Sequence, residues 1–473
     1  MNVTSPRSWT LVLPPVIAAA AVAVGLRLGA PRAGIPAALV YGAAASGQGL
    51  AWQIVAFEED GASREPMAGA DLAVTARAGG REARWQGTTD PDGVAEALLP
   101  LPGPDGLWLE VRRGDVLLAG GDATTPATIP PREPPAAAWM PFARRDGAIV
   151  IDVAVLGQRV APGFPAVLLV HATDAVTREP VTSASVELES DPSLLPGGRG
   201  QTDSRGWAQL VTTPVGLAVS AAVRARSPDG RAGQWTGGLF VSPGAAEVRT
   251  RLRWASDEEP VFELIAPTPR AIAYVEVDDA QGRVWAAAVP LAGAPGALPT
   301  ASARAPRLSA GLYWVVCSSD AAGAARLGPG TAARPFFVAP NDEAALSFGT
   351  DPLGCAAPGD PRELPAALAS CLALARAAPV ARWTALDGSS MQQARDRARR
   401  SRGLAVAVGA VVLAALLELM LLLRAAAASR QRLRAEVDPD GAPSALARAW
   451  SVGAALLVAL LGFALLAAFL TRV

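Results

Sequence analysis

The sequence predicts a mainly β protein: two or three β-sandwich domains, then a short helical stalk and a C-terminal two-helix transmembrane hairpin. Three observations predict this class. Between residues 48 and 340, short β-branched and aromatic runs alternate with Gly, Pro and Asp turns, as in all-β sandwiches. One sequence pattern occurs twice with a period near 114 residues, about one sandwich per repeat. Two apolar stretches of more than 20 residues follow near the C-terminus.

Composition excludes several classes of function. The chain has 473 residues, which implies two to four domains, and its formal net charge of −1 argues against a nucleic-acid partner. Every basic residue is Arg and Ala is abundant, as a GC-rich bacterial genome tends to produce. Because Lys is absent, no Schiff-base or phosphate-binding lysine exists. His171 is the single histidine, which excludes a zinc site built on several imidazoles. We expect no cofactor and no metal.

The chain begins with an apolar span that resembles an export signal. Residues 1–30 contain a basic start and a run from Trp9 to Leu26, typical of a signal peptide or signal anchor. A small-residue cleavage site is not clear, although "GAAAS" at 42–46 is a candidate. We expect residues 31–47 to be a linker.

Three sandwiches are expected after this linker, over residues 48–130, 146–245 and 246–340. Runs such as "AIVIDVAVL" (148–156) and "ASVELES" (184–190) have the alternation of half-buried strands. The stretch "AIAYVEVDDAQGRVWAAAV" (271–289) reads as a hairpin with its turn at Asp279 to Gly282.

The repeated pattern contains an Asp-rich turn. "GTTDPDGVAEALL" (87–99) and "GQTDSRGWAQLVT" (200–212) place Asp90 and Asp203 three residues before Gly93 and Gly206. Asp accepts backbone hydrogen bonds in such turns, and Gly takes the positive φ. A calcium loop would need a third acidic ligand at the next odd position and a Glu at position 12, which neither copy has. We therefore interpret these four residues as structural.

The second copy, residues 160–210, resembles the macroglobulin-type immunoglobulin-like domain. The matching features are Pro162-Gly163, Pro180-Val181, the strand with Ala184, Val186 and Leu188, and the stretch from Thr202 to Ala208. The first copy, at about 48–122, and the region 258–340 are less similar. The resemblance implies an immunoglobulin-like sandwich fold. The thioester motif Cys-Gly-Glu-Gln of full macroglobulins is absent, so protease trapping is not implied.

A helical stalk is expected over residues 341–402. Asp360, Pro361 and Glu363 form a helix-start signal, after which Leu364, Leu368 and Cys371 share one face. In an oxidising compartment Cys355 and Cys371 would close a disulfide; the competing interpretations are a Cys317–Cys355 pair and simple burial of Cys371. A second helix, after Ser390, is expected to continue into the membrane.

The apolar stretches 403–423 and 449–471 are each long enough to cross a bilayer, with a loop at 424–448. Arginines flank both sides almost equally, so the N-terminal span decides the orientation. We expect a bacterial inner-membrane protein with residues 30–402 in the periplasm. Glu418, inside the first stretch, is a candidate intramembrane functional residue, or else reaches the interface.

Catalytic motifs are not found. His171 has no G-x-S-x-G partner, and acidic pairs such as Glu58-Glu59 fall at turns or strand ends. We expect a non-enzymatic envelope protein that presents its domains for protein or glycan binding or scaffolding, with the lipid bilayer as a second partner. The alternative is a sensory or transport-accessory subunit that acts through the hairpin and Glu418.

Overall fold

The computed structural model describes most of residues 16–435. Outside the description lie residues 1–15, 18, 26, 28–33, 46–48, 61–62, 102–105, 124–139, 141–142, 158, 190–197, 218, 243–245, 267–270, 295, 319–330, 354, 356, 378–379, 381 and 436–473. The predicted helix 449–471 and most of the loop 424–448 therefore fall outside it. The chain divides into a β-rich unit, residues 36–58 and 64–388, and a unit of residues 1–35, 59–63 and 389–473.

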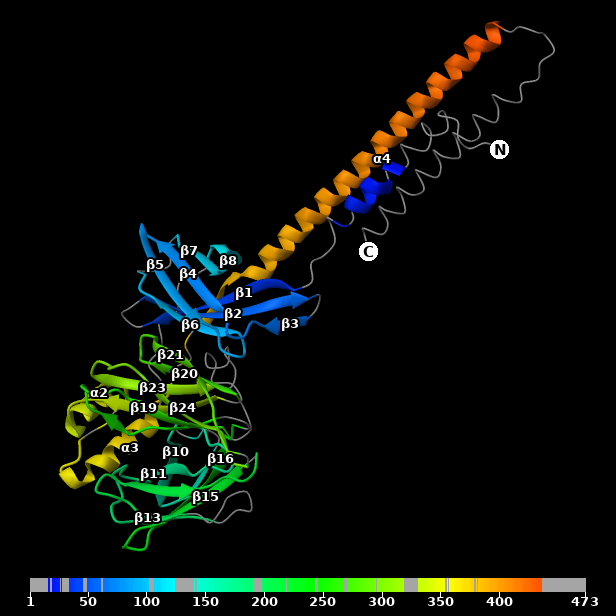
Figure 1. The fold of residues 1–473 in the computed structure, drawn as a ribbon. Helices are drawn as coiled ribbons and strands as arrows, with labels where there is room; N and C mark the ends of the chain where they lie inside the picture. The colour runs from blue at the N-terminus through cyan, green and yellow to red at the C-terminus, as the bar shows by residue number, and fades with distance from the viewer. Residues whose placement is uncertain are drawn as a thin grey trace. The chain divides into compact units, whose positions relative to one another are not determined.

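The first sandwich of the β-rich unit surrounds one apolar core (Figure 1). One of its sheets has the order β5-β4-β7-β8, and β1, β2, β3, β6 and β25 belong to a larger sheet. Side chains of β4 alternate between exposed and buried, the period of a half-buried strand. The strands are β1 (Ile35–Ala45), β2 (Gly49–Asp60), β3 (Ser63–Pro66), β4 (Asp71–Ala78), β5 (Arg81–Thr88), β6 (Val94–Leu99), β7 (Trp108–Arg113), β8 (Val116–Asp122) and β25 (Arg382–Asp387).

β1 corrects the predicted linker at 31–47. Residues 35–45 form a strand that pairs antiparallel with β25, from Leu39 opposite Asp387 to Ala43 opposite Arg382. Ala37, Ala38 and Val40 are fully buried. The prediction was wrong because a run of small Gly and Ala residues looks like a linker. Here the small residues allow close packing: a Cβ added at Gly42 would lie 2.7 Å from the Trp383 ring, so glycine leaves room for that ring.

The second sandwich packs a three-stranded sheet, β10-β11-β14, against a five-stranded sheet, β13-β12-β15-β16-β9. The inward side chains of both sheets, among them Leu168, Val186 and Trp235, form its core. The strands are β9 (Arg144–Gly147), β10 (Ile149–Val155), β11 (Ala166–Asp174), β12 (Ser185–Leu188), β13 (Arg199–Gln201), β14 (Trp207–Thr212), β15 (Val219–Arg226) and β16 (Ala232–Leu239).

The third sandwich shares a sheet with the first. β18-β24-β23-β20-β21 continues into β1-β2-β3, because β21 pairs parallel with β1 at Ala45 opposite Arg283. The facing sheet is β17-β19-β22. The strands are β17 (Glu247–Arg249), β18 (Arg253–Trp254), β19 (Val261–Ile265), β20 (Ile272–Asp278), β21 (Arg283–Pro290), β22 (Thr300–Arg304), β23 (Gly311–Ser318) and β24 (Thr331–Val338). These strands confirm the predicted mainly β class.

The predicted stalk 341–402 is largely part of the β-rich unit. α2 (Asp342–Leu353), the 3₁₀ turn η2 (Pro361–Glu363) and α3 (Leu364–Leu374) pack their apolar residues on β23 and β24, with Leu372 and Ala375 fully buried. Ala369 and Ala373 of α3 also contact Leu169 of the second sandwich. Because α3 is apolar on several sides, packing it against the sheets is more favourable than exposing it to water. The chain then returns through β25 to the first sandwich.

α4 (Gly388–Ala435) forms most of what the structure describes of the other unit. It continues without a break through the predicted span 403–423. Within the described residues it is the one helix long and apolar enough to cross a membrane, with a mean hydropathy of 2.7 in its most apolar window. Most large side chains along this stretch are exposed, among them Leu413 and Leu416, as expected of a lipid-facing helix.

Candidate functional site

The Asp-rich turns have the same geometry in both copies. Asp90 Oδ1 accepts the N–H groups of Asp92 at 2.9 Å and Val94 at 2.8 Å. Asp203 Oδ1 accepts those of Arg205 at 2.9 Å and Trp207 at 2.8 Å. Each carboxylate is therefore bonded to the backbone of its own turn. Asp90 and Asp203, which we predicted to be structural, lie at corners of the sandwiches. Burial raises the pKa of Asp90 above its ordinary value, against the lowering effect of its backbone hydrogen bonds.

A buried threonine completes each corner. Thr89 Oγ1 and Thr202 Oγ1 each accept a backbone N–H at 2.8 Å, from Ala70 and Ala184. Each hydroxyl also donates to a carbonyl on the preceding loop, that of Met67 or Val181. Gly93 and Gly206 both have φ of 76°. The repeated sequence therefore encodes a strand-to-strand corner, and the described residues hold no cluster of three or more metal-ligating side chains.

Of the remaining predicted residues, only His171 lies beside one of these corners, the second. Cys355 and Cys371 are joined by a disulfide, which links the chain after α2 to α3, while Cys317 is buried and takes no part in this disulfide. Glu418 lies in α4, and its side chain is outside the described residues. His171 stacks on Trp207 with ring centroids 4.6 Å apart, and burial lowers its pKa. Of the described residues among these, only the two disulfide-bonded cysteines are brought together.

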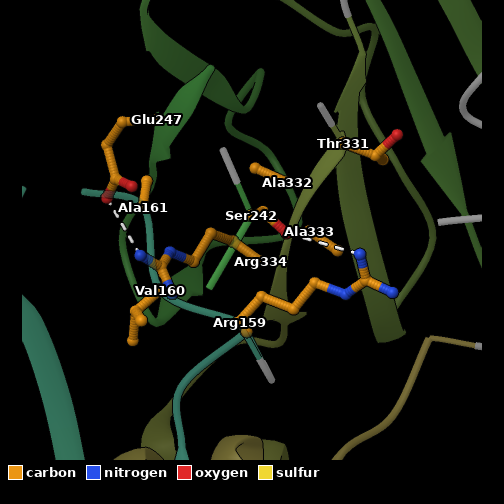
Figure 2. A pocket seen from close by; sticks show the side chains of 10 residues that line it. Arg159, Val160, Ala161, Ser242, Glu247, Thr331, Ala332, Ala333 and Arg334 are labelled. Carbon is orange, nitrogen blue, oxygen red and sulfur yellow. Dashed lines mark hydrogen bonds and ion pairs between the residues drawn. The ribbon is translucent and has the colours of Figure 1, made fainter. Parts of the chain in front are cut away.

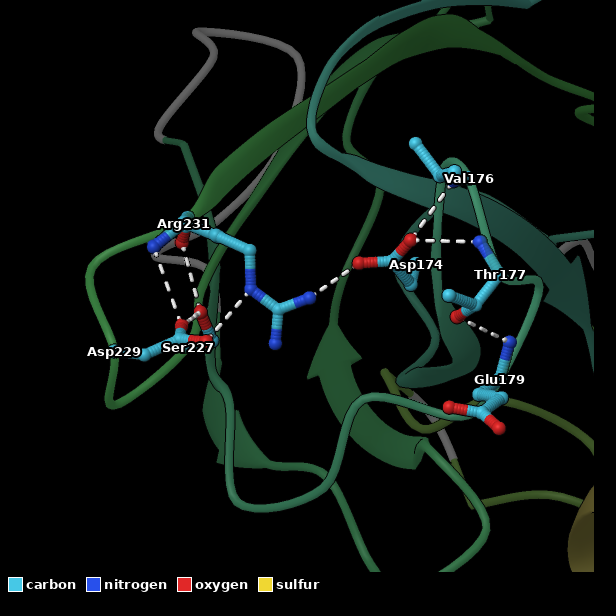
Figure 3. A network of polar contacts seen from close by, with 7 residues as sticks. All are labelled: Asp174, Val176, Thr177, Glu179, Ser227, Asp229 and Arg231. Atoms are coloured by element: carbon cyan, nitrogen blue, oxygen red, sulfur yellow. Dashed lines mark hydrogen bonds and ion pairs between the residues drawn. The ribbon is translucent and has the colours of Figure 1, made fainter.

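The candidate site is the loop end of the second sandwich that points away from the third sandwich. The other end, around Ala161 and Phe164, packs on Ile265 of the third sandwich. We define the free loop end as residues 174–180, between β11 and β12, and residues 227–231, between β15 and β16 (Figure 3). Val176 is 90% exposed at the tip of the first loop. An exposed apolar side chain on a fixed loop is the kind of contact that protein interfaces bury.

Polar contacts fix both loops in one conformation. Asp174 Oδ1 accepts the N–H groups of Val176 at 2.8 Å and Thr177 at 2.9 Å, and its other oxygen pairs with Arg231. Arg231 also donates to Asp229 at 2.7 Å, and the Ser227 hydroxyl donates to Asp229 (Figure 3). The two loops are therefore held together by Asp174 and Arg231.

These contacts also set the charge of the loop end. The backbone N–H groups of Thr177 and Val176, together with Arg231, lower the pKa of Asp174. The Ser227 hydroxyl and Arg231 lower the pKa of Asp229. Both carboxylates are therefore ionised at neutral pH. Sequence analysis missed this network. The Asp229-Gly230 dipeptide is a turn signal that could have located the hairpin, but the pairing of Arg231 with Asp174 depends on the fold.

A small crevice lies between the second and third sandwiches (Figure 2). Arg334 pairs with Glu247 at 2.9 Å, and Arg159 donates to Ser242 at 3.3 Å. Burial, and to a lesser degree the charge of Arg376, lower the pKa of Arg159. The enclosed space is about 10 Å³, roughly that of one water molecule. This crevice is too small to hold an organic ligand. One contact that joins the two sandwiches here is the hydrogen bond that Arg334 donates to the Leu156 carbonyl oxygen.

A buried ion cluster joins the first and third sandwiches. Arg283 of β21 is 1% exposed and pairs with Glu96 of β6 at 3.0 Å and with Glu276 of β20. Gln53 donates to the other oxygen of Glu96 at 2.7 Å, and the Tyr274 hydroxyl donates to Asp92 at 2.8 Å. These side chains form polar contacts between the first and third sandwiches.

No model of a known protein family matches the chain, and no curated protein sequence matches it. Among solved structures, invasin, a bacterial integrin-binding protein, is similar at 11% identity over 64% of this chain and 60% of that one, with a TM-score of 0.15. The Yersinia pseudotuberculosis adhesin InvE is similar at 16% identity over 45% of this chain and 62% of that one, with a TM-score of 0.17. A Salmonella alpha-2-macroglobulin mutant is similar at 12% identity over 65% of this chain and 21% of that one, with a TM-score of 0.16.

Identities and TM-scores this low give no basis for assigning the functions of these proteins to this chain. This chain spans less than two thirds of each of these three structures. The fold assignment rests instead on strand topology: β11 pairs with β14, β12 with β15, and the two sheets face each other across one core. The second sandwich thus has the two facing sheets and the strand pairing of an immunoglobulin-like β-sandwich.

Proposed function

We propose that the protein is a non-catalytic, membrane-anchored envelope protein that binds another protein through the free loop end of its second sandwich. The observation that carries the proposal is the network of Asp174 and Arg231, which holds two exposed loops in place around Val176. A preorganised loop loses little conformational entropy on binding. A glycan partner is less favoured, because neither loop exposes an aromatic side chain for a sugar to stack on.

The membrane anchor in this proposal is α4, with the stretch 449–471 as its hairpin partner. The long apolar helix and the exposure of its large side chains support it. We place the β-rich unit in the periplasm of a bacterium and the anchor in its inner membrane. A protease-sensitive tag inserted at Gly114, where an added Cβ meets nothing within 4 Å, tests this. Cleavage after the outer envelope alone is opened supports the placement, and protection until the inner membrane is broken contradicts it.

Photocrosslinking in cells tests the binding surface. A photoreactive residue replaces Val176, and the matched control replaces Val116, which is 47% exposed on a hairpin of the first sandwich. We expect a discrete protein adduct from position 176 that is absent from position 116. The adduct should also disappear when Asp174→Ala releases the loop. Adducts of the same pattern from both positions, or none from position 176, would exclude this surface.

Glu418→Gln separates the proposal from the sensory or transport-accessory alternative. If the sandwiches carry the function, a variant that still inserts should retain the crosslink from position 176 and the wild-type phenotype. If the intramembrane carboxylate carries it, the variant should fail although it inserts normally. The matched control is Glu187→Gln, a half-exposed surface carboxylate of β12.

A further inference from the structure

The described part of the N-terminal span is helical and packs on α4. Residues 16–17, 19–25 and 27 are helical, and Figure 1 shows this short blue helix beside α4. Val22, Ala407 and Val411 form a cluster in which they are 3%, 4% and 9% exposed. The two segments belong to the same compact unit. A face of α4 that would otherwise meet lipid is therefore covered by residues of the N-terminal helix.

The two helices approach closely because small residues meet. A Cβ on Gly25 would lie 2.8 Å from the carbonyl oxygen of Gly403 and 3.1 Å from the Cβ of Ala407. Such a Cβ would be too close to the backbone, so Gly25 is the residue that allows the approach. Small residues at the interface are how transmembrane helices pack without a hydrophobic driving force.

The contacts also give the direction of the pair. Gly25 lies opposite Gly403 and Ala407, whereas the earlier Val22 contacts Ala407 and the later Val411. The helices are therefore antiparallel. Val16, Ile17 and Val24 are more than half exposed, as side chains that face lipid would be.

Cleavage at the candidate site 42–46 conflicts with the fold. Gly42 and Ala43 are in the middle of the β1–β25 pairing, opposite Trp383 and Arg382. A cut there would separate most of β1, including the buried Ala38 and Val40, from the first sandwich. The core of that sandwich thus depends on residues N-terminal to the candidate cleavage site.

We propose that the apolar span from Trp9 to Leu26 is retained in the mature protein as a transmembrane segment, and that its described helical part packs antiparallel on residues 403–411 of α4. The occupant of this face of α4 is the chain's own N-terminal helix. It follows that the N-terminus and the sandwiches lie on opposite sides of the membrane. This inference is independent of what the sandwiches bind.

Cysteine crosslinking in isolated membranes tests the pair. The full chain carries an N-terminal epitope tag and a protease site at Gly114. After cleavage the two fragments stay together on a non-reducing gel only if a disulfide links residue 25 to α4. The native Cys355–Cys371 disulfide lies within the C-terminal fragment and does not interfere. We expect Gly25→Cys with Ala407→Cys to crosslink at least about five times more than Val24→Cys with Ala407→Cys. A Cβ at residue 25 lies 3.1 Å from that of Ala407, whereas Val24 is 55% exposed and outside the contact cluster.

A second pair, Val22→Cys with Val411→Cys, leaves Gly25 in place and should crosslink in the same way, against Val24→Cys with Val411→Cys as control. Loss of the N-terminal tag from the mature chain would overturn the proposal, because it would show cleavage. Equal crosslinking in test and control pairs, or none in both test pairs, would also overturn it.

Discussion

At the scale of single residues, aspartate side chains determine the local geometry of the sandwich corners and of the exposed loop. Asp90 and Asp203 replace missing strand partners by accepting backbone N–H groups of their own corners. Asp174 does the same for the exposed loop that it begins, and it also pairs with Arg231. Because each carboxylate has partners close in sequence, the corners were predictable. The Asp174–Arg231 pair was not, because 57 residues separate its members.

Gly206→Ala tests why the corner needs glycine. Gly206 has φ of 76°, and an added Cβ would lie 2.5 Å from the Ala172 carbonyl oxygen. Gly163→Ala is the matched control, with φ of 83° and nothing within 4 Å of the Cβ. We expect the control to lose about 1 kcal/mol of unfolding free energy for the left-handed backbone, and Gly206→Ala to lose about 1 to 3 kcal/mol more for the overlap. Denaturant unfolding followed by tryptophan fluorescence measures both, and equal losses would contradict the steric argument.

Asp174→Asn tests the charge of the free loop end. The folded-state pKa of Asp174 is lowered, so its contribution to stability is full above the unfolded pKa, about 3.9, and is lost as pH falls through the folded pKa. We expect the variant to melt below the wild type at pH 7, with the gap closing only in strong acid, where both side chains are neutral. Asp115→Asn, on an exposed turn, should show no gap. A gap for Asp174→Asn that persists unchanged at pH 2 would contradict this origin.

At the scale of elements, the disulfide stabilises the helical layer between the second and third sandwiches. Cys355 and Cys371 are 16 residues apart, and both lie in the cluster formed by α2, α3 and the β23–β24 sheet. The helix start at Asp360 and the apolar face of α3 were readable from sequence, since both are local patterns. That this face packs on two sandwiches, rather than forming a stalk, was not readable.

Removal of both cysteines measures the contribution of the disulfide. Closing a loop of this length stabilises a protein by about 3 kcal/mol. We expect Cys355→Ala with Cys371→Ala to lose roughly this amount, and a reductant to lower the melting temperature of the wild type. The double variant should show no response to the reductant. A response of the same size in the double variant would place the sensitive bond elsewhere.

At the scale of the whole β-rich unit, Arg283 connects two sandwiches. Its guanidinium is buried between Glu96 of the first sandwich and Glu276 of the third, at the register where β1 meets β21. Taking these charges out of water has a cost, so the cluster adds more to the specificity of this pairing than to its stability. Glu96 lies 187 residues from Arg283 in sequence, and the three residues carry no motif.

Arg283→Met tests the junction. The change leaves Glu276, which is 2% exposed, without its buried cation, and we expect a loss of about 3 to 5 kcal/mol of unfolding free energy. Adding Glu276→Leu and Glu96→Gln should recover most of the loss, since the charges are then removed together. Arg199→Ala breaks the exposed pair with Glu187 and should cost about 1 kcal/mol or less. Similar losses for Arg283→Met and Arg199→Ala would show that the buried cluster has no special role.

Sequence by itself determined the features that depend on neighbours along the chain. Alternating strands gave the β-sandwich class, the Thr-Asp-x-x-Gly corners gave the repeat, and the run of apolar residues at 403–423 predicted the long helix. Tertiary structure alone decided that β1 and β25 pair across more than 300 residues, that α2 and α3 cover two sandwiches, and that Gly25 meets Gly403. The physical reason is that strand pairing, burial of an ion pair and close helix contact depend on residues remote in sequence, whereas periodicity, turn chemistry and hydropathy are local.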